Sequence, residues 1–574
     1  MSVRPEVQAA FDRPDYDVLI IGGGINGLAT FRDLAMQGVR VLLVERNDFA
    51  SGASAASSHM IHGGIRYLEN GEFRLVRESV RERNGLLRIA PHHVSPLATT
   101  IPIQGVFSGI LAAPLRFLTH KQGSPKARGA VLIKIGLTIY DLFSRDGGSV
   151  PRHRFHGRRA SRRELPELAP DFRFTATYYD ASLRDPERLA LDVALDGEAS
   201  GAAAGQATAL NYVEAVGGDE NGVIVRDALT GTEQTITSRV IVNASGPWTD
   251  LTAGALGKPS SLMGGTKGSH VVLDNPELLA ATGGREIFFE HQDGRIVLVY
   301  PLKGRVLVGT TDLEADPGER AVCTEEEVDY FFELVGQVFP DVRVDRSQIV
   351  YRFSGIRPLP RHDDMVPGFV SRDYRIVDSQ GPGAPMLNLV GGKWTTFRAL
   401  GEQLADRVLA LLQRERSAST EDVSIGGGRN YPRPEAKDAW IRSELGGVSL
   451  ERGRILLERY GTRAREVVNF LADAHDEPIL GDRLSSREVA YFVEHEKATR
   501  LNDVLLRRTD VTYTGDLTSD VFEHTLAAFA DAAGWDASRV EEERSLSLDD
   551  LQAAHGVSPR VAPERAGQRR RTAR

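Results

Sequence analysis

Residues 17–30 read Asp17-Val-Leu-Ile-Ile-Gly-Gly-Gly-Ile-Asn-Gly-Leu-Ala-Thr30. The run Val18–Ile21 is continuously apolar, as expected for a strand that is buried on both faces of a sheet. It leads into Gly22-x-Gly24-x-x-Gly27, and a helical pattern follows. Glycines in this order allow a tight turn, close backbone approach to a pyrophosphate and close packing of helix against strand. The stretch therefore predicts a dinucleotide site with the phosphates at the helix N-terminus.

A second predicted strand supports the dinucleotide site. Gly38 ends the helix, and the apolar run that follows it leads to Glu45. An acidic residue about 20 residues after the glycines can accept hydrogen bonds from the hydroxyls of an adenosine ribose. A glycine pattern alone would be weak evidence, but strand, glycines, helix and carboxylate in this order predict an FAD or NAD site.

The composition is that of a globular protein with two or more domains, with 574 residues, 41% hydrophobic and 26% charged. A net charge of -9 argues against a nucleic-acid-binding protein. The single cysteine, Cys323, excludes an internal disulfide and a cysteine-ligated metal cluster, which fits the cytoplasm. No signal peptide and no run of about 18 apolar residues is present, so we expect neither secretion nor a membrane span.

Two further stretches resemble ligand-binding turns. The small-residue loop 51–58 leads into Ile61-His-Gly-Gly-Ile-Arg-Tyr67. A flexible serine-rich loop is the simpler alternative, but its place directly after Glu45 favours a binding role. Later, a strand ending at Asn243 opens onto Ala244-Ser-Gly246, and Gly391-Gly-Lys-Trp-Thr-Thr-Phe-Arg398 repeats the order of strand, glycine turn and helix start. Each of these later motifs is weak on its own.

Together these motifs resemble the FAD-dependent, quinone-linked glycerol-3-phosphate dehydrogenases, within the D-amino-acid-oxidase-like flavoproteins. The resemblance rests on the following stretches, which occur in family order: 22–27, 61–69, Lys267-Gly-Ser-His270, Gly309-Thr-Thr-Asp312, Ser354-Gly-Ile-Arg-Pro358 and 391–398. It implies an α/β fold in which a Rossmann-like FAD-binding domain is interleaved with an antiparallel-sheet substrate domain. An all-α C-terminal domain would follow.

The resemblance implies the boundaries of the oxidoreductase region, and the composition marks the segments that follow it. An oxidoreductase region is predicted over 1–412, with FAD-binding parts at about 16–100, 185–250 and 352–412 and substrate or cap parts at about 101–184 and 251–351. Residues 413–434 are rich in Arg, Ser, Glu and Gly and are predicted to be a linker. Amphipathic helices over 454–474, 487–507 and 519–533 indicate a helical domain at 435–555, before a basic disordered tail at 556–574.

The resemblance also assigns roles to residues. Oxidation of a secondary alcohol needs a hydride acceptor and a base, and His62 or His270 could serve as the base, with a slight preference for His62. Arg66, Tyr67 and Arg357 would hold the substrate beside the flavin, with Arg357 counted as catalytic. Arg372 and Lys393 would bind or steer its phosphate. The helix start after Gly392 would face the pyrimidine end of the flavin.

The predicted cofactor contacts surround the glycine turns and the serine loop. They are Gly22, Gly24, Asn26, Gly27, Glu45, Ser54, Ser57, Ser58, His62, Gly63, Gly64, Ala244, Gly246, Gly392, Lys393, Thr395 and Thr396. No metal ligands are predicted.

One departure from the family leaves the substrate open. Where many members have a lysine before the His-Gly-Gly motif, this chain has His59. The substrate is thus sn-glycerol 3-phosphate or a related polyol phosphate, such as a four-carbon one. An oxygen-using glycerol-3-phosphate oxidase and an amino-acid oxidase are alternatives, and so is a regulatory protein with a structural flavin.

The resemblance also bears on the electron acceptor and on where in the cell the protein is found. It implies a quinone acceptor, and the apolar segments within 105–140 flank the basic residues Lys121, Lys126 and Arg128. These segments are too short to span a bilayer. Buried helices of the substrate domain are one interpretation, and peripheral contact with the cytoplasmic membrane face is the other. A homodimer is also open.

Overall fold

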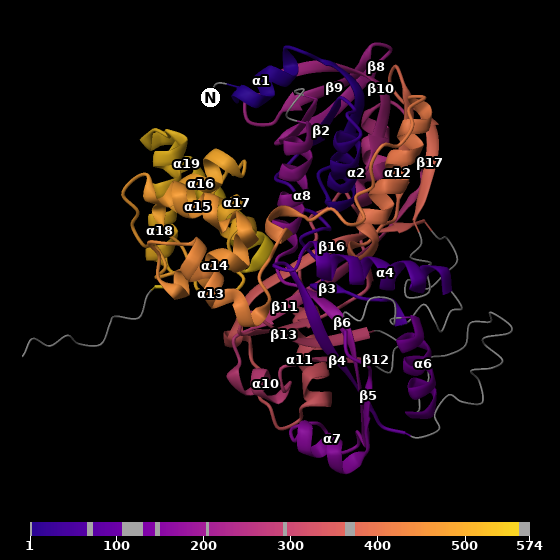
Figure 1. Cartoon of the computed structure of the whole chain (residues 1–574), viewed down its shortest axis with the longest axis vertical. Helices are drawn as coiled ribbons and strands as arrows, with labels where there is room; N and C mark the ends of the chain where they lie inside the picture. Colours follow the sequence, from indigo (N-terminus) through magenta and orange to yellow (C-terminus); the bar gives the residue numbers. More distant parts are fainter. Residues whose placement is uncertain are drawn as a thin grey trace, which may run out of the picture.

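The computed structural model describes residues 3–65, 73–105, 130–143, 150–201, 206–290, 296–361 and 374–561. Figure 1 shows one sheet with its helices at the top, a second sheet below it and a body of helices at the left. Of the predicted site residues, Arg66, Tyr67 and Arg372 lie outside the described ranges. So do most of the segment 105–140 and residues 562–574 of the predicted basic tail.

The upper sheet is mostly parallel. Its spatial order is β17 (Arg375–Gln380), β18 (Pro385–Val390), β10 (Glu233–Asn243), β1 (Asp15–Ile21), β2 (Val41–Glu45) and β7 (Ala207–Asn211). β1 pairs in parallel with β2 and β10, whereas β17 is antiparallel to β18. β8 (Val213–Asp219) and β9 (Gly222–Asp227) continue from β10 as an antiparallel meander.

Both faces of this sheet are covered, as the apolar run at 18–21 predicts. Val18 and Ile20 join one core with α2 (Ile25–Met36), α8 (Pro186–Gly201) and α12 (Phe397–Leu411). Leu19 and Ile21 join a second core, to which α1 (Pro5–Phe11) and α9 (Thr249–Ala255) contribute. Helices on both faces are the arrangement that leaves the carboxyl ends of parallel strands free for a ligand.

The lower sheet is mainly antiparallel. Its order is β15 (Leu313–Glu314), β11 (Met263–Leu273), β14 (Arg305–Gly309), β13 (Ile296–Leu302), β12 (Glu286–Glu290), β4 (Val94–Ile103), β6 (Phe174–Leu183) and β3 (Met60–Ile61). β16 (Ile349–Pro360) pairs with β11, and β5 (Arg154–His156) pairs with β6. Since these strands come from segments between those of the upper sheet, the two domains are interleaved as predicted.

Helices lie against both faces of the lower sheet. α10 (Pro276–Ala281) and α11 (Glu325–Val338) share one core with β11 and β13. α4 (Phe73–Ile89) and α6 (Ala130–Phe143) pack on β6 from the other face, and α7 (Arg158–Glu164) lies beside β6. α11 begins with a capping box, in which Thr324 accepts from the backbone of Glu327. α10 separates β11 from β12, because Asn275 caps a helix that begins at Pro276.

The C-terminal domain is helical, as predicted. Its helices are α13 (Lys437–Glu444), α14 (Leu450–Tyr460), α15 (Ala464–Ala472), α16 (Ser486–His495), α17 (Leu501–Asp503), α18 (Ser519–Ala533) and α19 (Ala537–His555). Short turns complete the described chain: η2 (Gly246–Trp248), η3 (Arg346–Gln348), η5 (Trp394–Thr396), η6 (Gly426–Gly428), η7 (Pro434–Ala436), η8 (Gly461–Arg463) and the π-turn η9 (Val504–Arg508). The helix predicted over 487–507 is divided, because Lys497 adopts a positive φ of 55° and Glu496 is paired with Arg188 of α8.

The glycines of the segment 413–434 pack closely against their neighbours. A Cβ on Gly427 would lie 2.0 Å from the carbonyl oxygen of Tyr460, and one on Gly428 would lie 2.3 Å from that of Ile89. Backbone therefore meets backbone where the helical domain joins the rest of the molecule. The glycines serve close approach at this junction.

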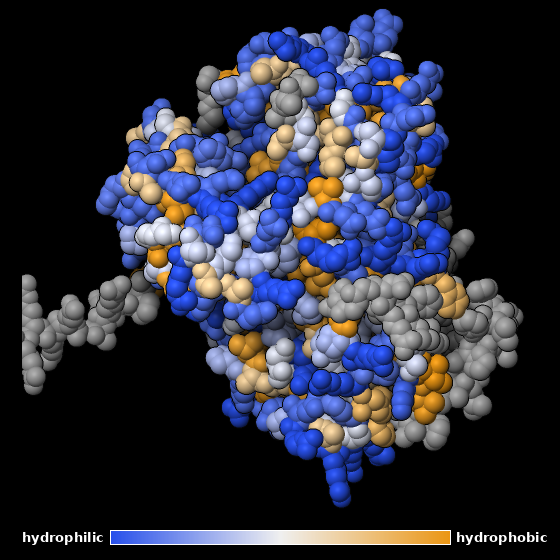
Figure 2. Space-filling view, in the orientation of Figure 1, coloured by the Kyte–Doolittle hydropathy of each residue, from blue (hydrophilic) through white to orange (hydrophobic). Residues whose placement is uncertain are grey.

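The visible surface is mostly hydrophilic, with scattered hydrophobic residues (Figure 2). On α6, Val131 is 37% exposed and Ile135 is 53% exposed. Among the described helices, none has both the length and the apolar character needed to cross a bilayer.

Candidate active site

The first glycine turn lies where β1 and β10 end. Gly22 has a φ of +113°, and a Cβ there would lie 2.6 Å from the carbonyl oxygen of Ala244. A Cβ on Gly27 would lie 2.0 Å from the carbonyl oxygen of Gly22. Side chains at these two positions would separate the strand, the helix and the turn after β10. The structure thus brings together Gly22, Gly27 and Ala244, three of the predicted cofactor residues.

Glu45 lies beside this turn at the end of β2. Its Oε2 accepts a hydrogen bond from the backbone N–H of Gly23 at 2.7 Å, and its Oε1 accepts one from Asn47 at 2.9 Å. Burial raises the pKa of this carboxyl, although the two backbone donors favour its charged form. Each oxygen keeps a second lone pair, so two ribose hydroxyls could donate to it.

The serine loop joins three parts of the site. The Oγ of Ser54 accepts from the backbone N–H of Ile25 at 3.0 Å, at the start of α2. Its carbonyl oxygen accepts from the indole of Trp394 at 3.0 Å, which connects the loop to the second glycine turn. The Oγ of Ser58 lies 2.8 Å from Nε2 of His270, on the lower sheet. Ser57 makes a local contact, accepting from the backbone N–H of His59 at 3.2 Å.

The second glycine turn faces the first. Gly392 has a φ of +113°, and a Cβ there would lie 2.4 Å from Nδ2 of Asn26. Thr395 and Thr396 are buried in the short turn that begins α12, and Lys393 caps that turn. Gly246, with a φ of +64°, forms the third turn, after β10. Residues from three segments of the chain therefore line one cradle.

This cradle suits an extended dinucleotide. Two buried polar atoms within it, Oδ1 of Asn26 and Oγ1 of Thr396, have no hydrogen-bond partner among the described residues. Buried polar atoms normally have hydrogen-bond partners, so we expect a polar ligand to supply the partners of these two atoms. Glycine turns, a helix N-terminus at Ile25 and the carboxylate of Glu45 provide the donor and acceptor set that FAD requires.

His270 is held in a neutral form. It lies on β11, is buried, and stacks on Phe353 with ring centroids 4.8 Å apart. Burial lowers its pKa well below the usual value, and the nearby Arg357 adds to this effect. A neutral imidazole can accept a proton or a hydrogen bond from a substrate hydroxyl.

His62 lies beyond the serine loop, directly after β3. It is half-buried, and the two glycines that follow it are buried. Gly64 has a φ of +79°, so the chain turns sharply here. The backbone N–H of Gly63 donates to Oδ1 of Asp180 at 2.9 Å, which fixes the turn to β6.

Arg357 lies on β16 and contacts the turn at 309–312. Its guanidinium donates to Asp312 Oδ1, to Thr310 Oγ1 and to the carbonyl oxygen of Thr311, each at 2.9 Å. A Cβ on Gly268 would lie 2.1 Å from the guanidinium, so the glycine makes room for it. An anionic substrate that binds this guanidinium would accept hydrogen bonds from it alongside Asp312.

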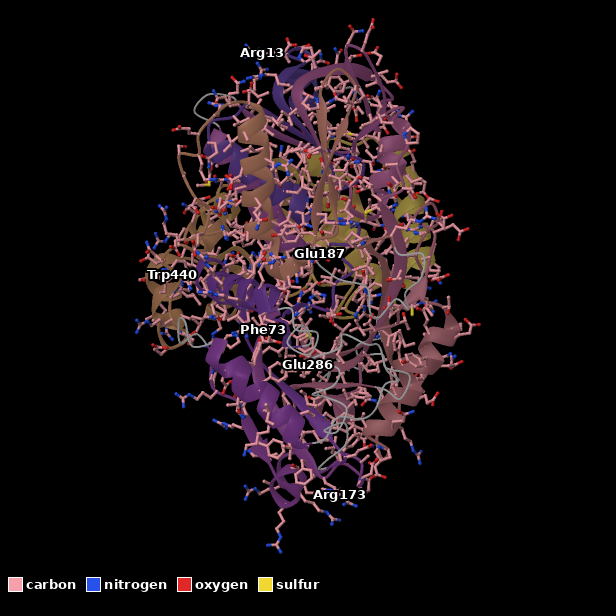
Figure 3. All side chains as sticks on the ribbon, turned by 90° about the vertical axis from the view of Figure 1, so that its right-hand side faces the viewer. Arg13, Phe73, Arg173, Glu187, Glu286 and Trp440 are labelled. Carbon is pink, nitrogen blue, oxygen red and sulfur yellow. The ribbon has the colours of Figure 1, made fainter. Side chains whose placement is uncertain are left out.

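Buried acids on the lower sheet were not found from the sequence. Glu286, which is labelled in Figure 3, is 0% exposed and begins β12. Its Oε2 accepts from Thr99 at 2.8 Å. Burial raises its pKa to about 8, so it is mostly protonated at neutral pH. An acid directly before the apolar run Ile287-Phe-Phe289 was the signal that could have indicated a buried carboxyl.

His59, the position that departs from the family pattern, has a positive φ of 54° and borders a cavity of about 30 Å³. The other residues around this cavity include Asp185, Glu187, Lys303 and Tyr513. The cavity lies between the serine loop and the helical domain and has room for about one water molecule. Position 59 is therefore at a domain interface.

One cluster in the described ranges has metal-ligand character. Nε2 of His92 and of His93 lie 3.1 and 3.0 Å from Oδ2 of Asp192, and all three residues are buried. Arg463 lies 3.5 Å from the same carboxylate. The positive charge of Arg463 disfavours a metal cation at this place. The distances from the two histidines to Asp192 are those of ordinary hydrogen bonds.

Comparisons with known proteins agree with this geometry. The model of the FAD-dependent oxidoreductase family matches residues 17–407, and that of the C-terminal domain of alpha-glycerophosphate oxidase matches residues 418–540. A glycerol-3-phosphate dehydrogenase of Synechocystis sp. is 34% identical over 94% of this chain and 96% of that protein. A D-erythritol 1-phosphate dehydrogenase of Brucella abortus is 33% identical over 86% of this chain and 94% of that protein.

A solved structure shares the fold. The glycerol-3-phosphate dehydrogenase from Bacillus halodurans, complexed with FAD, matches with a TM-score of 0.71 at 22% identity, covering 95% of this chain and 96% of that one. The predicted fold class and the predicted family are both confirmed. The chain belongs to the FAD-dependent oxidoreductases, in the family that contains these glycerol-3-phosphate dehydrogenases.

Proposed function

We propose that this enzyme oxidises sn-glycerol 3-phosphate, or a polyol phosphate close to it, at the secondary hydroxyl. The carbon loses a hydride and the oxygen loses a proton, so that a ketone such as dihydroxyacetone phosphate forms. The observation that carries the proposal is the 2.8 Å contact between Ser58 and His270, because it joins the loop that is predicted to bind FAD to the sheet that is predicted to bind the substrate. The names of the relatives at 34% and 33% identity support the same class of substrate.

The residues divide the chemical work. FAD, when bound, supplies the hydride acceptor. His62 or the neutral His270 takes the hydroxyl proton, and we retain the preference for His62. Arg357, with Arg66 and Tyr67, holds the substrate, and Arg372 and Lys393 attract its phosphate.

The four-carbon substrate has a specific argument in its favour. The Brucella abortus relative, named for D-erythritol 1-phosphate, is nearly as similar as the Synechocystis one. His59 also departs from the family pattern close to the site. A substrate panel therefore has to include both polyol phosphates.

Electrons leave the flavin for a quinone in this proposal. The exposed Val131 and Ile135 on α6, beside Lys134, have the character of an interfacial contact with the cytoplasmic face of a membrane. A cytoplasmic, peripherally bound enzyme, alone or as a homodimer, is the form we propose. The division into residues 1–412, 413–434 and 435–555 is part of the same proposal.

The deciding experiment is anaerobic reduction of the bound flavin. We expect sn-glycerol 3-phosphate or erythritol phosphate to bleach the flavin absorbance, and a quinone analogue to restore it faster than oxygen does. Bleaching by amino acids alone would favour an amino-acid oxidase. Colour that persists with the whole panel would favour a structural flavin and would overturn the proposal.

The role of Arg357 has a matched control on the same strand. Arg352 also lies on β16 and pairs with a carboxylate, Glu325, at 2.7 Å. Loss of a charged hydrogen-bond donor costs about 1.5–3 kcal/mol, so Arg357→Ala should raise the KM about 10- to 100-fold with FAD retained. Arg352→Ala should leave the KM within about twofold. Equal effects of the two substitutions would remove Arg357 from the site.

A further inference from the structure

A buried carboxylate lies beneath the turn that follows His62. Oδ1 of Asp180, on β6, accepts three hydrogen bonds: from the backbone N–H of Gly63 at 2.9 Å, from the hydroxyl of Tyr140 at 2.6 Å and from Arg83 at 3.0 Å. Asp180, Arg83 and Tyr140 are all fully or almost fully buried. Three elements, β6, α4 and α6, therefore meet under the turn.

The Tyr140 hydroxyl contacts Arg83 and Asp180, and only Asp180 can accept its proton in a hydrogen bond. Arg83 donates to this oxygen at 2.7 Å, and a guanidinium cannot accept a hydrogen bond. The hydroxyl therefore donates its own proton to Asp180. Burial raises the pKa of Tyr140 well above its usual value, and Asp180 adds to the effect, so the proton stays on the oxygen near neutral pH.

Gly63 is shaped for this contact. A Cβ at that position would lie 2.0 Å from the Tyr140 hydroxyl oxygen and 2.8 Å from the ring carbon that bears it. Any side chain there would push the turn away from Tyr140. The glycine lets the hydroxyl and the carboxylate sit directly against the backbone next to His62.

We propose that Tyr140, acting through Asp180 together with Arg83, is a positioning residue for His62. This inference rests on the proposed role of His62 as a base. The anchor fixes the residue next to His62, and its loss would let the turn shift. A displacement of about 1 Å in a reacting group can slow catalysis by about 100-fold.

The helical domain contains a matched control. The Tyr460 hydroxyl donates to Oε1 of the buried Glu488 at 2.7 Å, and Arg459 and Arg452 also bind that carboxylate. Tyr140→Phe and Tyr460→Phe thus remove the same kind of buried hydrogen bond. Only the first bond contacts the His62–Gly64 turn.

The experiment compares the two variants as FAD-loaded full-length enzymes. For Tyr140→Phe we expect the limiting rate of anaerobic flavin reduction to fall about 10- to 100-fold, with half-saturation changed less than about twofold. Amide hydrogen exchange in the peptide covering residues 60–65 should become faster. Tyr460→Phe should change neither quantity. An unchanged rate in Tyr140→Phe, or equal losses in both variants, would overturn the proposal.

A second pair of variants tests the contact directly. Gly63→Ala should slow flavin reduction, and Gly63→Ala combined with Tyr140→Phe should be faster than Gly63→Ala alone, because the nearest clashing atom is gone. If the double variant instead reduced its flavin more slowly than either single variant, by the product of the two separate losses in rate, the proposal would be overturned. The hydrogen-exchange result does not depend on the substrate, so it stays decisive for the position of the turn. Wild-type flavin that no polyol phosphate bleaches would instead overturn the proposed function.

Discussion

Glu45 and Asp48 are two acids at the end of the same strand, and they have opposite environments. Glu45 accepts only from backbone N–H groups in the described structure, and burial raises its pKa. Asp48 is 0% exposed and binds Arg508 through two nitrogens, at 2.7 and 3.0 Å, and Arg507 at 2.6 Å. Burial alone would raise the pKa of Asp48, but the two arginines hold it well below its usual value.

The difference separates the acid that is proposed to bind the ribose from an acid that docks a domain. Glu45 keeps lone pairs that a ribose can use, whereas the arginines of the helical domain neutralise Asp48. Since the two residues are neighbours, the helical domain is braced against the edge of the cofactor cradle. Each of the following experiments tests whether these two roles are in fact separate.

The largest expected effect is on stability, in Asp48→Ala. Removal of one partner of a buried ion pair leaves uncompensated charge and costs about 3–5 kcal/mol. Chemical denaturation should show this loss in the free energy of unfolding. Asp438→Ala, which breaks the exposed pair with Arg454 at 2.6 Å, should leave the free energy of unfolding nearly unchanged, because solvent screens that pair. Similar losses in both variants would contradict a docking role for Asp48.

Next is the affinity for FAD, tested in Glu45→Gln. Hydrogen bonds from ribose hydroxyls to a charged acceptor contribute about 1.5–3 kcal/mol, so affinity should fall about 10- to 100-fold. The free energy of unfolding of the apoprotein should fall little or rise. Glutamine does not ionise, so the variant avoids the cost of ionising a buried carboxyl whose pKa is raised. Titration of apoprotein with FAD measures the change. An unchanged dissociation constant would show that Glu45 does not bind the ribose.

A smaller effect should appear in the pH dependence of stability, with opposite signs for the two acids. Because the folded pKa of Asp48 is lowered, its contribution is present above about pH 3.9 and is lost as pH falls towards the folded value. Because the folded pKa of Glu45 is raised, ionisation costs stability as pH rises from about 4.3 through the folded value.

Unfolding free energies across pH would test these signs. Asp48→Asn should flatten the curve below about pH 4, and Glu45→Gln should flatten it above about pH 4.3 in the apoprotein. Each unit of pKa shift corresponds to about 1.4 kcal/mol. Flattening on the same side in both variants would contradict the contrast.

The smallest expected effect is that of Arg507→Gln. Asp48 keeps both bonds to Arg508 in this variant, and Arg507 is the more exposed arginine, at 12% against 1% for its side chain. Denaturation should show a loss in the free energy of unfolding that is smaller than that of Asp48→Ala, although the pair of Arg507 with Asp503 at 2.6 Å is lost as well. A loss as large as that of Asp48→Ala would show that Arg507 carries the docking alone.

Local sequence patterns predicted those elements whose formation depends on residues close by in the chain. The buried strand at 18–21 and the glycine turns depend on neighbours within a few residues, and all are present. The division of the helix predicted over 487–507 was missed, because its cause includes Arg188, some 300 residues earlier. The roles of His62, Arg357 and Lys393 stay predictions.

By itself, the sequence determined the fold class and the glycine turns, because apolar periodicity and glycine-rich turns act over short distances along the chain, and its motifs placed the chain in its family by resemblance. Only the tertiary structure decided which buried acid has which partner. Asp48 meets Arg508, Asp180 meets Tyr140 and Glu286 meets Thr99 through contacts between distant segments. In a low-dielectric interior these partners set both charge and position, and no spacing in the sequence records them.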